Sequence, residues 1–409
     1  METLQKNRKG NSVFTCCLIA YTVIYVGRVN LSVASPLMIN EGIADVARIG
    51  ILGSIFSVAY AAGRLLSGRI CDRTAPKLVI TAGICTAGLA NLLMGTAPAY
   101  LLMAFLWGVN ALGQSVLWGS VLNSMSAVYE GSELKKRTAL MTTSIPVGNI
   151  IGYLLSSYLC AGPGWRTAFY VPGILCILSG IAARVILKDV KLKTGGAGRE
   201  AVRSASGDPG VPAAAGNILK EIPKQDVYGK LIPAFLHGLI KDNSSFWLPT
   251  ILAMQYLVKS EVTGLLVVIV PCIGFVGRLA YPTALRAAGD DEEKVSFWCF
   301  VVTGICSALL VTGIGSPVLV SVLIGVIYAA TSMINTTFLS VYPIRFADRG
   351  CAATISGIMD FLTYLGASAG SAVFGIMAAK LGYGSLYVSW TVITVLAVIL
   401  LLTGRKKCA

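Results

Sequence analysis

Residues 13–38 read VFTCCLIAYTVIYVGRVNLSVASPLM. This stretch contains one charged residue, Arg28, and it is longer than the roughly 20 apolar residues with which a helix crosses a bilayer core. The segment before this stretch is polar and basic, and the stretch itself contains no small-residue cleavage pattern. We therefore expect a retained transmembrane helix and no removed signal peptide. The whole chain has this character, since 55% of its 409 residues are hydrophobic and only 13% are charged. Such a chain needs lipid as its solvent.

Similar apolar stretches recur along the chain and predict an all-α integral membrane protein with twelve transmembrane helices in two pseudo-symmetric six-helix bundles. The predicted spans cover residues 13–38, 49–70, 78–96, 100–126, 138–160, 167–187, 231–257, 263–285, 295–314, 317–341, 351–379 and 385–403. The stretch between the sixth and seventh spans is rich in Gly, Ala and Lys, which is typical of a flexible linker. We therefore divide the chain into a first bundle (1–187), a cytoplasmic linker (188–230) and a second bundle (231–409).

The two halves are related by a repeat. Gly63-Arg64-Leu65 recurs 214 residues later (277 − 63) as Gly277-Arg278-Leu279, and residues 164–169 are echoed by residues 382–387. Parallel six-helix repeats of this kind place a ligand site at the interface between the halves.

Basic residues give the chain a net charge of +14, and they gather in alternate loops. With a cytoplasmic N-terminus, the inside segments contain Lys6, Arg8, Lys9, Arg69, Arg73, Lys77, Lys135, Lys136, Arg137, Arg345, Arg349, Arg405, Lys406 and Lys407. The outside loops contain Arg48, Arg166, Lys259 and Lys380. This asymmetry predicts a multi-pass protein of the cell (plasma or inner) membrane with both termini in the cytoplasm. It also explains the net charge through anionic membrane lipids, without nucleic acid as a partner.

Two cations lie far from either end of an apolar span, at equivalent places in the two halves. Arg28 lies inside the first predicted helix and Lys241 inside the seventh, 213 residues apart (241 − 28). A cation at the bilayer centre is costly, so each should face a wet cavity or a partner, and together they can bind an anion between them. The alternative is a structural role in which Asp242 or Asp360 neutralises them. Asp242 is the poorer partner for Lys241, because neighbours at i and i+1 point apart on a helix.

Polar residues at helical spacing favour a central cavity over lipid-facing helices. The stripes on five predicted helices are Tyr21, Tyr25, Arg28 and Ser32; Asn110, Gln114 and Trp118; His237, Lys241 and Ser245; Tyr328, Ser332 and Asn335; and Asp360, Tyr364 and Ser368. Any single stripe is explained equally well by helix packing. His237 is expected to be neutral and hydrogen-bonded, the alternative being a proton carrier, and Asp360 is the candidate for proton coupling.

Three residues at the end of the second predicted helix, Gly68, Asp72 and Arg73, suit a charged latch at the cytoplasmic face, the alternative being a solvated turn. Arg64 and Arg278 lie near cytoplasmic helix ends, where we expect their side chains to reach the interface. The sequence contains no phosphate-binding Gly-Lys-Ser/Thr loop, no metal-ligand cluster and no nucleophile beside a base. We therefore expect no cofactor, no metal and no enzymatic activity.

The segment Gly68-x-x-x-Asp72-Arg73 resembles the signature of the major facilitator superfamily, with Ala75 where that signature has a later glycine. Other segments resemble its organophosphate:phosphate antiporter family, which includes glycerol-3-phosphate and hexose-phosphate exchangers. They are Arg28 followed by Asn30 and Pro36, Asn110-x-x-x-Gln114-Ser115-x-x-Trp118, Trp247-x-Pro249-Thr250 and Tyr364-Leu365-Gly366. The chain departs from that family at Lys241 (arginine in the glycerol-phosphate exchangers), at Gly148 before Asn149 (histidine) and at Gly119 (proline).

The resemblance implies a monomeric secondary transporter that moves a small anionic solute, an organophosphate or another anion such as a carboxylate, by alternating access. It implies that Arg28 and Lys241 bind the anionic group. From the polar stripes we further expect Tyr21, Tyr25, Asn110, Gln114, Trp118, His237 and Tyr364 around it, with a proton or inorganic phosphate as the candidate coupling ion. Two alternatives remain at this point: a membrane sensor that binds the same anion without moving it, and a proton-coupled exporter of another small molecule.

Overall fold

The computed structural model describes residues 2–188, 190, 224–346 and 352–405. In these ranges the chain forms helices and short turns and no strand. The first half contains α1 (Glu2–Asn40), α2 (Val46–Arg73), α3 (Pro76–Thr96), α4 (Tyr100–Ser115), α5 (Leu117–Val128), α6 (Gly131–Met141), α7 (Ser144–Ala161) and α8 (Thr167–Ile186). The second half contains α11 (Lys224–Met254), α12 (Ser260–Ala287), α13 (Glu292–Val311), α14 (Pro317–Thr336), the π-helix η1 (Thr337–Val341), the 3-10 helix η2 (Tyr342–Phe346), α15 (Ala352–Leu381) and α16 (Gly384–Arg405).

Eleven helical segments of the described chain are long and apolar enough to cross a membrane. The helix α11 is the twelfth long helix, and its hydropathy is lower because polar residues, Lys241 and Asp242 among them, occupy its centre. The expected all-helical membrane fold is confirmed. Helix ends differ from the predicted bounds: α1 begins at Glu2, and α11 begins at Lys224, so residues 224–230 of the predicted linker are helical. Residues 191–223 of that linker lie outside the described residues.

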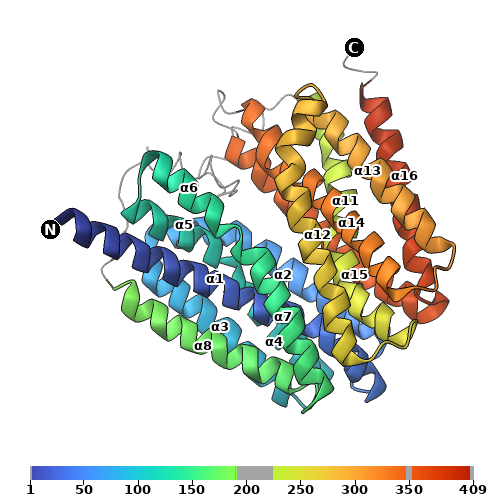
Figure 1. The fold of residues 1–409 in the computed structure, drawn as a ribbon, viewed down its shortest axis with the longest axis horizontal. Coiled ribbons are helices and arrows are strands. Elements are labelled where there is room, and N and C mark those ends of the chain that lie inside the picture. The colour runs from blue at the N-terminus through green and yellow to red at the C-terminus, as the bar shows by residue number, and fades with distance from the viewer. Residues whose placement is uncertain (1, 189, 191–223, 347–351, 406–409) are drawn as a thin grey trace.

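The helices form two bundles, one from each half of the chain (Figure 1). In the first bundle α3 packs on α8 and α1 on α7, and in the second α12 packs on α14 and α13 on α16. The bundles meet along α2 with α15 and α7 with α12, with a smaller contact between α1 and α11. In Figure 1 they diverge toward the ends that carry the N- and C-termini.

The contact between the bundles is close at the end away from the termini. Gly50 of α2 lies against Gly375 of α15, where a Cβ on Gly50 would come within 2.4 Å of the Ser371 carbonyl oxygen. Between α7 and α12, the Ser157 hydroxyl donates to the Ser260 carbonyl and accepts from the Gly264 backbone N–H. Small residues let the two backbones approach each other, so this end of the interface is shut.

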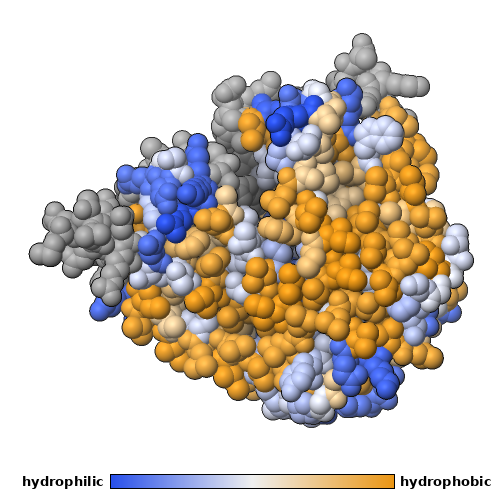
Figure 2. All heavy atoms as spheres, in the orientation of Figure 1, coloured by the Kyte–Doolittle hydropathy of each residue, from blue (hydrophilic) through white to orange (hydrophobic). Residues whose placement is uncertain are grey.

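The outer surface is apolar around the middle of the molecule. Figure 2 shows hydrophobic residues across this part of the drawn face and hydrophilic residues toward its margins. Large apolar side chains are exposed on several helices, for example Leu101 (80%), Phe105 (66%), Leu265 (64%) and Ile305 (57%). Exposed apolar surface of this extent, on helices of spanning length, is what lipid contact requires.

Candidate functional site

A cavity of about 500 Å³ lies between the two bundles. Its walls come from helices of both halves, with α1, α2, α4 and α7 on one side and α11, α12, α14, η1 and α15 on the other. Of the residues predicted to bind a substrate, Tyr25, Arg28, Lys241 and Tyr364 line it, as does the proton-coupling candidate Asp360. The structure therefore brings Arg28 and Lys241, from separate halves of the chain, to one cavity.

Arg28 is surrounded by aromatic rings. Its guanidinium carbon lies 4.7 Å from the ring centre of Tyr60, 5.1 Å from that of Phe56 and 5.5 Å from that of Tyr25. Among the ion pairs and hydrogen bonds of the described chain, none includes the Arg28 side chain. Aromatic faces stabilise a cation without occupying its N–H donors. The Arg28 donors are thus available to a ligand in the cavity.

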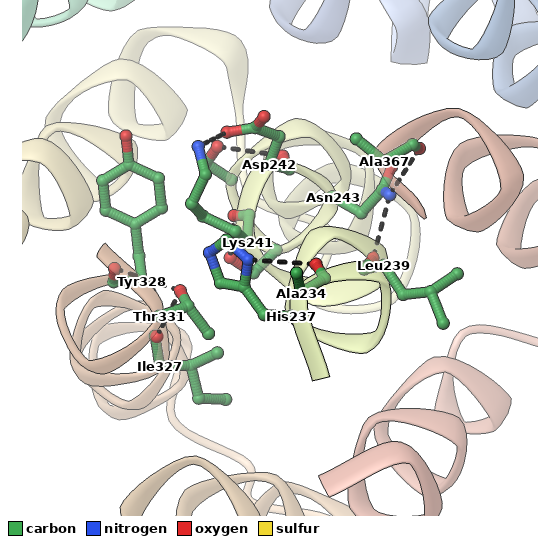
Figure 3. A network of polar contacts seen from close by, with 12 residues as sticks. Ala234, His237, Leu239, Lys241, Asp242, Asn243, Ile327, Tyr328, Thr331 and Ala367 are labelled. Atoms are coloured by element: carbon green, nitrogen blue, oxygen red, sulfur yellow. Dashed lines mark hydrogen bonds and ion pairs between the residues drawn. The ribbon is translucent and has the colours of Figure 1, made fainter. Parts of the chain in front are cut away.

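Lys241 has a different environment, and the prediction about its partner is wrong. Its Nζ lies 2.5 Å from Oδ1 of Asp242, the neighbour that helix geometry had made the poorer partner. The long lysine side chain bends back to the shorter aspartate, and Figure 3 shows the two groups meeting on one side of α11. Asp242 also lines the cavity, so the Lys241 charge is compensated there.

The second carboxylate of the cavity also belongs to an ion pair. Asp360 Oδ2 on α15 lies 3.5 Å from Arg64 Nε on α2, with only 9% and 12% of the two side chains exposed. Arg64 is therefore buried between the bundles, and the expectation that it reaches the membrane interface is wrong. Arg278, its counterpart in the repeat, lines the cavity.

The other predicted binding residues of α1 and α4–α5 lie outside the cavity wall, in contacts that hold helices together. Asn110 donates to the Gly27 carbonyl (3.3 Å) and accepts from Gln114 (2.9 Å), which joins α4 to α1. The rings of Tyr21 and Trp118 pack at 5.0 Å, and both residues are buried. The stripe on α4 and α5, together with Tyr21 of α1, thus fits the alternative of helix packing.

His237 is also outside the cavity wall. It is fully buried on α11, with Nδ1 3.4 Å from the Ala234 carbonyl oxygen and its ring in an edge-to-face contact with Phe338. Figure 3 shows the imidazole pointing toward α14 at Tyr328 and Thr331. This environment suits a neutral histidine that packs α11 against α14.

The predicted latch lies at the end of α2. Gly68 is in its last turns, Arg73 is its final, exposed residue, and the side chain of Asp72 lies outside the described residues. The cavity itself contains residues that sequence reasoning missed: the Phe56 ring beside Arg28, Asn149 and Tyr153 on α7, and Arg278. Of these residues, only Arg278 could have been found from the sequence, because it occupies the position equivalent to Arg64 in the repeat.

Comparison with known proteins gives the family. The family model described as Major Facilitator Superfamily matches residues 17–371. The chain belongs to this superfamily. Among solved structures, the fold is similar to the crystal structure of nucleoside transporter NupG (TM-score 0.71, 13% identity, 97% of this chain and 98% of that one). It is also similar to a bacterial homolog of the human lysosomal transporter Spinster in an inward-facing, unoccupied conformation (TM-score 0.74, 13% identity, 97% of each chain). At this identity the likeness shows the fold alone.

Curated relatives in the superfamily are similar over part of their length. The probable hexose phosphate transport protein of Chlamydia pneumoniae is 30% identical over 183 residues, which are 45% of this chain and 40% of that protein. The membrane sensor protein UhpC of Salmonella typhimurium is 27% identical over 171 residues, 42% of this chain and 39% of that one. In these first matches the chain thus covers about two fifths of the relative. The phosphoglycerate transporter protein of Salmonella typhimurium is 22% identical over 398 residues, 90% of this chain and 83% of that one.

Proposed function

We propose that the protein is a secondary transporter that moves a small organic anion, an organophosphate or a related compound, across a cell membrane by alternating access. One observation carries the proposal: Arg28 from the first bundle and Lys241 from the second line a single cavity between the bundles. An anion bound there touches both halves at once, so its binding is sensitive to their relative position. The names of the similar transporters of hexose phosphate and phosphoglycerate support a phosphorylated anion.

The interface between the bundles is closed at one end and open at the other, as alternating access requires of one of its two end states. The bundles are in close contact at Gly50–Gly375 and diverge toward the termini. With both termini in the cytoplasm, as the loop charges indicate, this is a state open to the cytoplasm. Return to the outside then requires the contact at α2 and α15 to open. The end of α2 with Gly68, Asp72 and Arg73 is our candidate for the opposing gate.

Asp360 remains the candidate for proton coupling. Its ion pair with Arg64 connects α15 to α2, and these helices belong to different bundles. Protonation of Asp360 would remove the attraction between the bundles at this point, which ties proton binding to their movement. The cavity lies within one chain, which suits a protein that works as a monomer.

Counterflow in proteoliposomes tests the proposal. Vesicles loaded with inorganic phosphate are expected to accumulate labelled glycerol 3-phosphate or hexose 6-phosphate, and Arg28→Gln should abolish uptake, because the anion then faces a half-filled pair of cations. The matched control is Arg48→Gln, whose arginine is exposed on α2 outside the cavity. Uptake retained by Arg28→Gln would contradict the proposal.

A second candidate, a membrane sensor of the same anion, is favoured by the similarity to UhpC. The purified protein separates the two. Ligands that bind the folded state raise its melting temperature, so a sensor would respond to organophosphates in a thermal-shift assay and yet show no counterflow. A thermal response to small carboxylates alone would reassign the substrate class.

A further inference from the structure

The cavity holds an excess of positive charge. Arg28, Lys241 and Arg278 line it together with the carboxylates of Asp242 and Asp360. Asp242 pairs with Lys241, and Asp360 pairs with Arg64, which is not part of this wall. Two cations, Arg28 and Arg278, are therefore left with no ion pair in the described part of the chain. Uncompensated charges within a membrane are costly and mark binding sites.

Arg278 is held at the cavity wall by contacts on either side along α12. One turn before it, Gly274 lies against the Tyr328 ring, where a Cβ would come within 2.6 Å of a ring carbon. One turn after it, the Tyr281 and Thr337 hydroxyls hydrogen-bond at 2.9 Å. These contacts fix α12 against α14 and η1 and leave Arg278 between them.

The elements against which α12 packs, α14 and η1, give the cavity a polar wall in which not every polar group has a hydrogen-bond partner. Ser332, Asn335 and Ser340 from α14 and η1 line the same cavity. Ser332 is 2% exposed, and its hydroxyl has no hydrogen-bond partner in the described structure. A buried hydroxyl is almost always hydrogen-bonded, and Ser332 lies in the cavity wall, so its hydroxyl is available to a ligand there. The π-helix η1 agrees, because π-helical turns are frequent at functional sites.

We propose that Arg278 is a second anion-binding residue and that the substrate is a small hydroxylated compound with two separate anionic groups. One group binds near Arg28 and Lys241, and the other binds near Arg278, with Ser332 and Asn335 hydrogen-bonding the polar atoms next to it. This inference rests on the proposed function and specifies its substrate class. Arg28 lies on α1 of the first bundle and Arg278 on α12 of the second, so we expect a different anionic group to bind at each.

Two ligands that differ by one carboxylate test the inference. In 3-phosphoglycerate a carboxylate replaces the terminal CH₂OH group of glycerol 3-phosphate. We expect the purified wild-type protein to bind 3-phosphoglycerate at least tenfold more tightly by isothermal titration calorimetry, because a charge-assisted hydrogen bond to Arg278 is gained. In Arg278→Gln the ratio of the two dissociation constants should fall to about one, whereas Arg278→Lys should retain part of it.

The control is Arg286→Gln, the same substitution on an exposed arginine of the same helix outside the cavity. It should leave the ratio at the wild-type value. A general loss of structure in Arg278→Gln would weaken the binding of both ligands equally and leave the ratio of their dissociation constants unchanged. An unchanged ratio overturns the inference. Equal wild-type affinity for both ligands also overturns the inference. The proposed function is judged separately, by the loss of counterflow uptake in Arg28→Gln. If neither ligand bound to wild type, the organophosphate substrate class itself would fail.

Discussion

Arg28 and Lys241 occupy equivalent places in the two halves, yet their surroundings differ. Arg28 lies among the rings of Tyr60, Phe56 and Tyr25 and forms no ion pair in the described chain, whereas Lys241 lies 2.5 Å from Asp242. The repeat thus conserves the position of a cation and not its electrostatic state. We infer that an incoming anion meets a free cation on α1 and must draw the other away from a carboxylate on α11.

Because of this difference, we expect Arg28 and Lys241 to contribute differently to anion binding. Rings stabilise Arg28 by roughly 0.5–2 kcal/mol per contact and do not compete with the anion for its donors. Asp242 does compete, because it is itself an anion within reach of the ligand. We therefore expect Arg28 to supply most of the affinity and the Lys241–Asp242 pair to adjust it.

On the α11 side, the largest expected effect comes from breaking the Lys241–Asp242 pair by changing Lys241. In Lys241→Gln the carboxylate of Asp242 faces the cavity alone, so the anion loses a cation and gains a repulsive neighbour. We expect anion affinity to fall by about 100-fold or more, because the anion loses one charge-assisted contact and meets a like charge in the cavity. Titration calorimetry with the substrate of the counterflow assay measures the loss.

The double variant Lys241→Gln/Asp242→Asn decides what causes that loss. Removing the stranded carboxylate should restore affinity to within about tenfold of wild type. The remaining loss then corresponds to the one charged contact that Lys241 made with the anion. Lys259→Gln, an exposed lysine before α12, is the matched control and should bind as wild type does. No recovery in the double variant would mean that Asp242 does not oppose the anion.

A smaller effect of opposite sign is expected from Asp242→Asn alone. The neutral amide frees Lys241 for the ligand, so anion affinity should rise on the order of fivefold, less than the full Coulomb gain because Lys241 also loses the partner that positions it. The same titration measures the change, and repeating it at high salt should reduce the gain. A drop in affinity would show instead that Asp242 holds Lys241 in its binding position.

Much of the fold follows from the sequence because the length of an apolar helix is a direct physical requirement of the bilayer. The meeting of Arg28 and Lys241 in one cavity follows from the repeat. The Lys241–Asp242 pair did not follow, because the spacing rule describes Cβ directions and ignores how far a lysine side chain can bend.

Contacts between the two halves could not be predicted from the sequence, for a different reason. Arg64 and Asp360 lie on α2 and α15, and nothing in local spacing connects two residues so far apart in the chain. The rings around Arg28 were equally hidden, since Phe56 and Tyr60 resemble any aromatic residues of an apolar span. The stripe of Asn110 and Gln114 misled for the same reason: periodicity identifies a polar face but not whether that face meets a cavity or another helix.

The smallest effect sharpens the comparison at Arg28. Phe56→Leu removes one ring and keeps an apolar side chain of similar bulk, so the ion pair on α11 is untouched. We expect anion affinity to fall only about threefold, because one cation–π contact at a partly wet site contributes about 0.5–1 kcal/mol and its loss lets the guanidinium move.

Phe105→Leu, on the exposed surface of α4, is the control for the same change in a lipid-facing position. It should leave the dissociation constant unaltered. A loss in Phe56→Leu as large as that in Lys241→Gln would mean that the rings do more than hold Arg28 in place, and that the substrate itself stacks on Phe56. In that case the cavity would select an aromatic or ring-bearing anion, because a flexible aliphatic anion offers no flat face to a phenyl ring.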